Sequence, residues 1–157
     1  MFGNLDKKQI EELLNNQVIG RLGCHYGGVT YVVPISYAYD GEYVYGHSLE
    51  GMKLDMMRKN PQVCFEVDDT TDLANWKSVV AWGEFEELEE GKERDKALTI
   101  LNNRMLPMIS SEKMRISPQW PFPSDDNSKI PGIAFRIQIK EKTGRFERSG
   151  EKFYYAT

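Results

Sequence analysis

The residues best suited to chemistry lie in two short motifs, GHS at residues 46–48 and GMK at residues 51–53. The second motif opens a predicted helix. Backbone N–H groups, the Ser48 hydroxyl and the Lys53 ammonium would therefore meet where the helix dipole favours an anion. This pattern predicts a phosphate site with Lys53 as the counter-charge. The alternative is that Ser48 only caps the helix and that Lys53 is a surface lysine.

His47 is the candidate for proton transfer in the same segment. An unperturbed histidine titrates at about pH 6.5, so His47 could donate a proton or a hydrogen bond to a reducible substrate or to the edge of a cofactor. A structural hydrogen bond explains a single histidine equally well. No Ser-His-Asp order or paired-carboxylate spacing indicates hydrolytic chemistry.

A flat aromatic cofactor that carries a phosphate also needs an apolar surface beside the anion. The segment before these motifs supplies a candidate shelf in Val32, Val33, Pro34 and Ile35, with Ser36 at its margin. The alternative is that this run is ordinary barrel core. Further along the chain, Ser78 is a small polar residue in the apolar run WKSVVAWG, and it needs a hydrogen-bond partner if it is buried.

The composition argues against a nucleic-acid platform, a metal site and a membrane protein. The formal net charge is -4, from 20 basic and 24 acidic residues, whereas nucleic-acid-binding domains usually carry a basic excess. The two cysteines, Cys24 and Cys64, are too few for a structural zinc site, and Cys64 within VCFEV is expected to be a buried thiol. Without a signal peptide or a long apolar run, the chain is expected to be soluble and cytoplasmic.

Local signals place six or seven strands and two or three helices in a single domain, residues 1–157. Helices are predicted over residues 6–16, 52–59 and 93–106. The Asp40-Gly41 pair between two aromatic and β-branched runs predicts a tight hairpin. Tight turns between most strands favour an antiparallel barrel closed by helices, and the alternative is an open α+β sandwich.

Other segments are predicted as breaks in the regular structure. Pro34 should mark an edge, a bulge or a local opening of its strand, because proline cannot donate to the ladder. Residues 68–75 are predicted as a polar loop, and residues 143–145 as a turn into a last strand that ends near Tyr155. Residues 107–131 hold five of the seven prolines and predict a long irregular loop, in which Trp120 either anchors the loop or faces a pocket or a partner chain.

The order of these motifs resembles the pyridoxamine 5'-phosphate oxidase-like FMN-binding split barrels, and in particular the branch of the nitroimidazole-resistance reductases. The resemblance covers residues 10–148 and rests on four runs in order: YVVPISYAYDGEYVYGHS, EGMKLDMMRKNPQVCFEVD, WKSVVAWGEFEEL and IAFRIQIKEKTGRFE. It implies a mostly β fold, a six-stranded antiparallel split barrel with flanking helices. It also implies a homodimer with two FMN molecules in clefts where the subunits meet.

The resemblance further implies which residues hold the cofactor. The phosphate falls to Lys53, and His47 matches an active-site histidine of the nitroimidazole-resistance branch. Met52 stands where the true oxidases carry a second basic residue, and the C-terminus lacks the segment with which they grip pyridoxamine phosphate, so vitamin B6 oxidation is not expected. The other implied flavin contacts are Val33, Pro34, Ile35, Ser36, Gly46, Ser48 and Ser78.

The function implied by the resemblance is that of an FMN-dependent oxidoreductase. It would reduce small aromatic or nitro-substituted compounds with electrons from NAD(P)H, the flavin carrying the electrons. One alternative is a non-catalytic flavin or haem binding protein or sensor on the same barrel, and another is a flavin-free structural relative. A small-molecule substrate and a second copy of the chain are the expected partners, with neither nucleic acid nor membrane.

Overall fold

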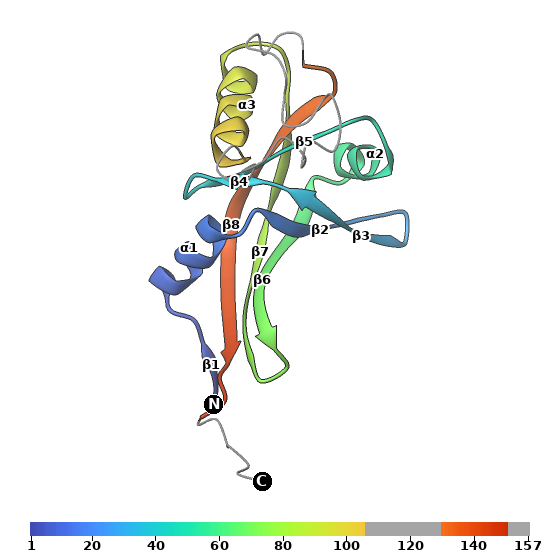
Figure 1. Cartoon of the computed structure of the whole chain (residues 1–157). Coiled ribbons are helices and arrows are strands. Elements are labelled where there is room, and N and C mark those ends of the chain that lie inside the picture. Colours follow the sequence, from blue (N-terminus) through green and yellow to red (C-terminus); the bar gives the residue numbers. More distant parts are fainter. Residues whose placement is uncertain (106–129, 151–157) are drawn as a thin grey trace, which may run out of the picture.

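The computed structural model describes residues 1–105 and 130–150, and within these ranges the chain forms one antiparallel sheet and three helices (Figure 1). The strands are β1 (Phe2–Asn4), β2 (Ile19–Tyr26), β3 (Val29–Ser36), β4 (Ala38–Tyr39), β5 (Tyr43–Ser48), β6 (Gln62–Asp72), β7 (Asn75–Leu88) and β8 (Ile133–Glu147). The helices are α1 (Lys7–Asn16), α2 (Met52–Lys59) and α3 (Lys92–Met105). All three predicted helices are confirmed, with ends that differ by at most one residue.

The two end strands of the sheet are consecutive in the chain, so the sheet curves round into a split barrel, although no strand pairing joins these two ends among the described residues. The hydrogen-bonded order is β3-β2-β6-β7-β8-β5-β4, and only Tyr37 separates β3 from β4. β3 pairs with β2 along its whole length, whereas β4 pairs with β5. The predicted antiparallel barrel is therefore confirmed, and the open sandwich is not formed.

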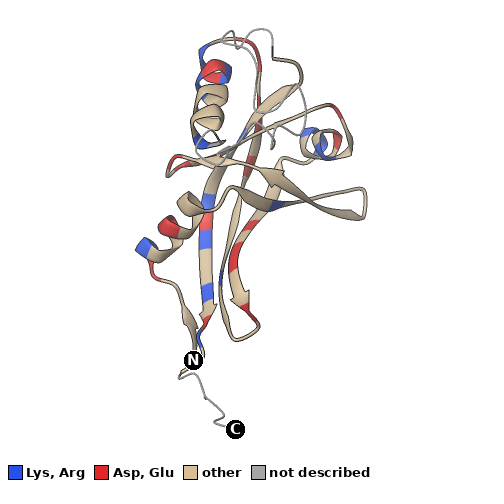
Figure 2. Ribbon diagram, in the orientation of Figure 1, with Lys and Arg blue, Asp and Glu red and all other residues tan. Residues whose placement is uncertain are grey.

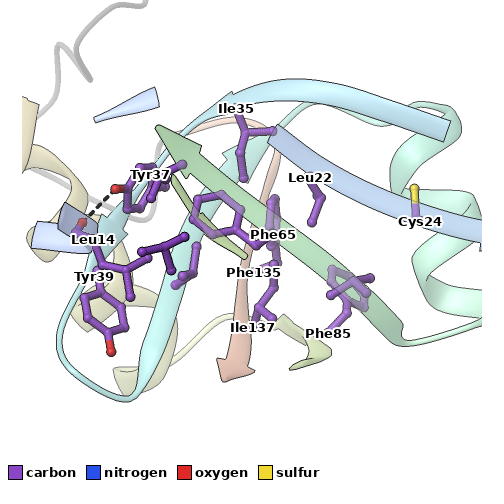
Figure 3. Close-up of a cluster of buried hydrophobic side chains, with 14 of the residues drawn as sticks. Leu14, Leu22, Cys24, Ile35, Tyr37, Tyr39, Phe65, Phe85, Phe135 and Ile137 are labelled. Carbon is purple, nitrogen blue, oxygen red and sulfur yellow. Dashed lines mark hydrogen bonds between the residues drawn. The ribbon is translucent and has the colours of Figure 1, made fainter. Parts of the chain in front are cut away.

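The described residues contain eight strands rather than the six expected. One additional strand is β1, which pairs with the end of β8 off the main path. The other arises because the strand through Pro34 changes partner at Tyr37. The buried Tyr37 hydroxyl donates to the Leu14 carbonyl at 2.6 Å, and its ring meets Phe65 edge-on with centroids 4.8 Å apart (Figure 3). These tertiary contacts hold the corner at which the strand divides.

α1 covers the barrel core beside this corner. Its N-terminus has a capping box: the Gln9 N–H donates to the Asp6 carboxylate at 2.8 Å, and the Asp6 N–H donates to the Gln9 side chain at 2.9 Å. The helix buries Ile10, Leu13 and Leu14 in the main hydrophobic core. In Figure 1 α1 lies below α3, and Arg104 of α3 donates a hydrogen bond to the carbonyl of Gln17, the C-cap of α1.

The predicted hairpin at Asp40-Gly41 joins β4 to β5, the strand that carries the GHS motif. The Asp40 carboxylate accepts hydrogen bonds from the backbone N–H groups of Glu42 at 3.0 Å and Tyr43 at 2.8 Å. Gly41 has a φ of +98°, which glycine adopts without a Cβ penalty. The hairpin is therefore confirmed, and it sets the register of residues 46–48 against β8.

The segment predicted as a polar loop over residues 68–75 is mostly strand. β6 runs to Asp72 and pairs with β7 as far as Asn75, so that Leu73 and Ala74 form the connection between them. The polar residues lie at the end of a long hairpin that extends past the body of the barrel (Figure 1). Polarity here marks an exposed strand end, and the prediction of a loop was wrong for this reason.

The turn predicted at residues 143–145 is also continuous strand, since β8 pairs with β7 across these positions. Gly144 is needed for close packing. A Cβ at this position would lie 2.8 Å from Leu5 Cβ and 2.9 Å from Ile10 Cγ1. The glycine lets the N-terminal segment pack directly on β8.

Pro34 lies in β3, whose only strand partner among the described residues is β2, so the predicted edge position is confirmed. Most of the predicted loop 107–131, including Trp120, lies outside the described residues, as does Tyr155. No helix in the ranges 1–105 and 130–150 is long and apolar enough to cross a membrane.

Candidate functional site

The N-terminus of α2 has no side-chain cap. The helix follows Gly51, whose position offers no capping hydrogen bond, and the Ser48 hydroxyl instead donates to the Leu49 carbonyl at 2.8 Å. The alternative in which Ser48 caps the helix is therefore wrong. The first N–H groups of a helix need partners from outside the helix, so this end of α2 is suited to an external anion.

Lys53 lies in this first turn and is half-buried. Its ammonium makes no hydrogen bond or ion pair with any residue in the ranges 1–105 and 130–150. Burial lowers the pKa of Lys53, and the Cys24 side chain acts in the opposite direction. By contrast, several basic residues lie along β8 (Figure 2), and Lys140 there lies 3.0 Å from Glu84. Desolvating a cation without a counter-charge is unfavourable, so Lys53 is poised to receive an anion.

His47 is held where β5 meets the start of β8. Its Nε2 lies 2.7 Å from the Pro131 carbonyl oxygen, and because a carbonyl only accepts, Nε2 carries the hydrogen. Gly132 has a φ of +95°, and a Cβ there would lie 3.0 Å from Nε2. Burial lowers the pKa of His47, the hydrogen bond to Pro131 opposes this, and the Arg94 charge lowers the pKa further. At neutral pH the ring is therefore uncharged and fixed in orientation.

The lowered pKa of His47 predicts a loss of stability in mild acid. A histidine in the unfolded chain takes up a proton as the pH falls through about 6.5, whereas folded His47 does so only at a lower pH. The unfolded state then binds more protons, so the free energy of unfolding should decrease as the pH falls below about 6.5. Urea titrations at a series of pH values should show this decrease.

The His47→Gln variant should lose the part of the decrease that is due to His47. His25 is the matched control because its side chain is exposed, and His25→Gln should retain the profile of the unaltered protein. If His47→Gln kept the full decrease, the acid sensitivity would arise elsewhere in the chain.

The predicted apolar shelf is divided between the two faces of β3. Val33 and Ile35 pack on the barrel core, whereas Pro34 and Val32 are exposed and Ser36 is half-exposed. The division follows from the alternation of side chains along a strand. A ligand on the outer side of β3 would therefore meet the side chains of Val32, Pro34 and Ser36, and only the main chain of the other two residues.

Gly46 faces the barrel interior. A Cβ added there would lie 2.8 Å from Cε2 of Phe135, whose side chain is fully buried. The Phe135 ring in turn packs on Phe85, with centroids 5.6 Å apart (Figure 3). The glycine of the GHS motif thus has a packing reason that is independent of any ligand.

A groove of about 490 Å³ lies over β2, β3, β6 and β7. Its lining includes Val32, Trp82 and Cys64. Val32 is 61% exposed, Trp82 is 42% exposed, and the Cys64 thiol is half-buried. The groove therefore offers a partly aromatic, apolar surface next to the outer side of β3.

Charged groups line one part of this groove. Arg21 and Glu66 belong to the lining and lie 3.6 Å apart, and Arg21 also forms an ion pair with Asp68. The Ser78 hydroxyl donates to the Glu66 carboxylate at 2.8 Å. Ser78 is half-buried, and its hydrogen-bond partner Glu66 lines the groove.

The prediction that Cys64 is a buried thiol was wrong, because it is half-buried. Cys24 is the buried thiol, at 3% exposure, and Cys64 lines the groove. Both strands alternate, and in β6 the inward positions are Val63 and Phe65. The alternation within VCFEV already contained this signal, since an inward Phe65 leaves Cys64 on the outer face.

The structure assigns the principal site candidates to separate elements. His47 lies in β5 beside the start of β8, Lys53 lies in α2 near Cys24, and Ser78 lies in β7 beside Glu66. Sequence reasoning did not single out the groove, because its lining comes from strands that are distant in the chain. The useful signal would have been apolar side chains at outward strand positions.

Several known proteins are similar to this chain in sequence or in fold. The family model described as pyridoxamine 5'-phosphate oxidase matches residues 6–146. An uncharacterized protein of Rhizobium meliloti (strain 1021) is 31% identical over 144 residues, covering 85% of this chain and 87% of the relative. A FAD-binding protein from Mesorhizobium loti is 31% identical with a TM-score of 0.71, covering 93% of this chain and 98% of that chain. A candidate 5-nitroimidazole antibiotic resistance protein from Bacteroides thetaiotaomicron has a similar fold, with a TM-score of 0.70 at 21% identity over 93% of this chain and 87% of that one.

Proposed function

Since the chain belongs to the pyridoxamine 5'-phosphate oxidase family, we propose that it binds FMN and acts as an oxidoreductase on small aromatic or nitro-substituted compounds. The observation that carries the proposal is Lys53, a half-buried ammonium with no ion pair among the described residues, at the uncapped start of α2. The relative from Mesorhizobium loti binds FAD, which supports a flavin as the cofactor.

The phosphate group of FMN fits the start of α2. A phosphate monoester carries about -1.5 to -2 charges near neutral pH and accepts several hydrogen bonds. The Lys53 ammonium would supply the opposite charge, and the first N–H groups of α2 would supply hydrogen bonds. Met52, which is 50% exposed, adds no charge beside it. The fit therefore depends on Lys53 as the charged contact.

The flavin ring fits the apolar surface on the outer side of β3. Val32, Pro34 and Ser36 present their side chains there, and Trp82 in the adjoining groove offers an aromatic face for stacking. The bound flavin would supply the electron transfer, with NAD(P)H as the electron donor. The protein would bind and orient the ring and exclude water from it.

His47 is the residue proposed to orient or protonate the substrate. A proton-transfer group must be held in a defined position, and the hydrogen bond to Pro131 fixes the imidazole ring. The lowered pKa of His47 keeps the ring neutral at neutral pH. Because Nε2–H donates to Pro131, Nδ1 of the neutral ring can only accept, so neutral His47 would orient a hydrogen-bond donor of the substrate. Protonating the substrate would require the imidazolium form of the ring.

A homodimer is proposed because the outer face of the barrel carries exposed apolar side chains. Ile19 is 54% exposed, Val32 is 61% exposed and Trp82 is 42% exposed, and all three lie on strands of the same region of the sheet. Clusters of exposed apolar side chains commonly mark interaction surfaces. A second copy of the chain would cover this face and complete the flavin cleft.

The proposal predicts that the purified protein is yellow or takes up added FMN, and that it sediments as a dimer. Mixed anaerobically with NADH or NADPH, its flavin absorbance should bleach, and a nitroaromatic acceptor should restore it. Protein that takes up neither FMN nor FAD would contradict the flavin assignment. Flavin that binds but transfers no electrons would support the non-catalytic alternative, and a haem absorbance band would support the haem-binding one.

A further inference from the structure

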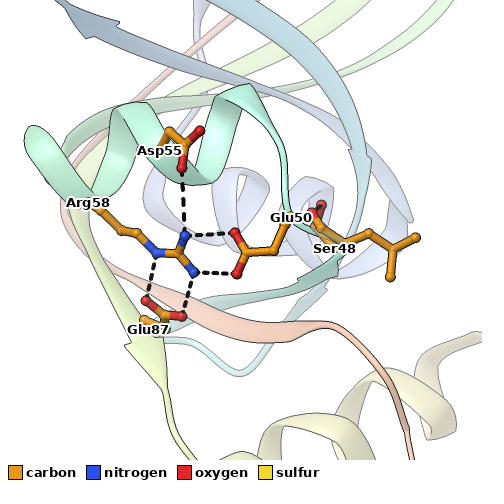
Figure 4. A network of polar contacts seen from close by, with 6 residues as sticks. Ser48, Glu50, Asp55, Arg58 and Glu87 are labelled. Atoms are coloured by element: carbon orange, nitrogen blue, oxygen red, sulfur yellow. Dashed lines mark hydrogen bonds and ion pairs between the residues drawn. The ribbon is translucent and has the colours of Figure 1, made fainter.

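Arg58 forms the densest ion-pair cluster near the proposed phosphate site. Its guanidinium donates two hydrogen bonds to Glu50, at 2.7 and 2.9 Å, and two to Glu87, at 2.7 and 2.9 Å. Asp55 lies 3.7 Å from the same group. Figure 4 shows the guanidinium enclosed by the three carboxylates. Two bidentate pairs on one guanidinium fix the orientation of all three partners strongly.

The cluster joins three parts of the chain. Arg58 lies in the last turn of α2, Glu50 lies directly before the N-cap of the same helix, and Glu87 lies near the end of β7. An eight-residue helix spans about 12 Å, and the Arg58 side chain runs back along it toward its start (Figure 4). The turn before α2 is therefore tied both to the helix and to the sheet.

Packing does not hold this turn in place. Leu49 is 62% exposed, and a Cβ added at Gly51 would meet no atom within 4 Å. The helix that follows has no side-chain cap. Among residues 1–105 and 130–150, the two hydrogen bonds from Arg58 to Glu50 are thus the strong side-chain contact of the turn that leads into Lys53.

We propose that Arg58, through Glu50, is a positioning residue that holds the turn 49–51 and the first turn of α2 in the geometry that receives the phosphate. This inference rests on the proposed flavin-binding function. The hydrogen bonds from Arg58 lower the pKa of Glu87 and of Glu50, so both carboxylates of the cluster are charged throughout the neutral range. The positioning by Arg58 should affect the binding of the phosphate and not that of the flavin ring.

The test compares the binding of FMN with that of riboflavin, which lacks the phosphate. Arg58→Gln and Glu50→Ala should each weaken FMN binding about ten-fold, the usual effect of losing charged hydrogen bonds, and leave riboflavin binding unchanged. Glu50→Ala is the sharper variant because it removes a negative charge near an anion. Charge alone would strengthen FMN binding in this variant, whereas loss of positioning weakens it.

Arg136→Gln is the matched control. Arg136 likewise bridges two carboxylates, Glu86 and Glu93, but it lies in β8. It should leave the FMN affinity unchanged. FMN affinity that is unchanged or increased in Glu50→Ala would overturn the positioning role, as would an equal loss of riboflavin binding. An unaltered protein that binds no flavin would overturn the proposed function itself, so the two failures are distinguishable.

Discussion

The Lys53→Ala variant should bind FMN about ten-fold more weakly or worse, while its affinity for riboflavin stays the same. A hydrogen bond to a charged group contributes about 1.5 to 3 kcal/mol. Lys53 has no competing partner among the described residues, so its positive charge would act on the phosphate alone. Fluorescence titration with the two flavins measures the difference directly, because they share the ring and differ in the phosphate.

The free energy of unfolding distinguishes a ligand-binding role of Lys53 from a structural one. Lys53 is half-buried and its pKa is lowered by burial, so removing its charge should not reduce the free energy of unfolding of the flavin-free protein. Lys140→Ala is the matched control, since Lys140 is paired with Glu84 on β8. FMN affinity that is equal in the unaltered protein and in Lys53→Ala would rule out Lys53 as the phosphate ligand.

The elements that could be predicted from the sequence are those fixed by local chemistry. The capping box at Asp6 and Gln9 satisfies its own backbone N–H groups, and the hairpin at Asp40 is closed by its own carboxylate. The helix over residues 52–59 ends at a proline that cannot continue it. Each of these signals lies within about ten residues, so no knowledge of the fold is needed to use it.

The features that could not be predicted depend on contacts between distant residues. The barrel strand divides at Tyr37 because Leu14 and Phe65 hold its side chain in the core. Gly144 resembles a turn residue, but it serves the packing of Leu5 on β8. Sequence patterns identify the residue type correctly in such cases, and the reason for it becomes visible only in three dimensions.

The candidate site divides in the same way. Lys53 could be found from its residue type and its place at the start of a helix. The partners of Arg58 are 8 and 29 residues away, in a turn and in another strand. The groove over β2, β3, β6 and β7 likewise exists only once the strands are paired. An anion site at a helix end is formed by residues that are close in the sequence, whereas this surface for a ring is formed by strands that are distant in the chain.

The second large expected effect is a loss of stability on substitution of Gly46. Its motif suggests a ligand contact, but the residue lies in the core. The Gly46→Ala variant should be about 1 to 3 kcal/mol less stable, the usual result of adding a group to a well-packed core. The added methyl group would meet the ring of Phe135, which is fully buried. Urea denaturation of the flavin-free protein measures this loss without any contribution from a cofactor.

The Phe135→Leu variant tests the cause by making room at the same point. In that background Gly46→Ala should have little effect on stability, giving a coupling energy of about 0.5 to 3 kcal/mol between the two positions. A cost that is the same in both backgrounds would remove Phe135 as the reason for the glycine. Loss of FMN affinity at unchanged stability would then assign Gly46 to the cofactor, as the resemblance to the flavin-binding split barrels implies.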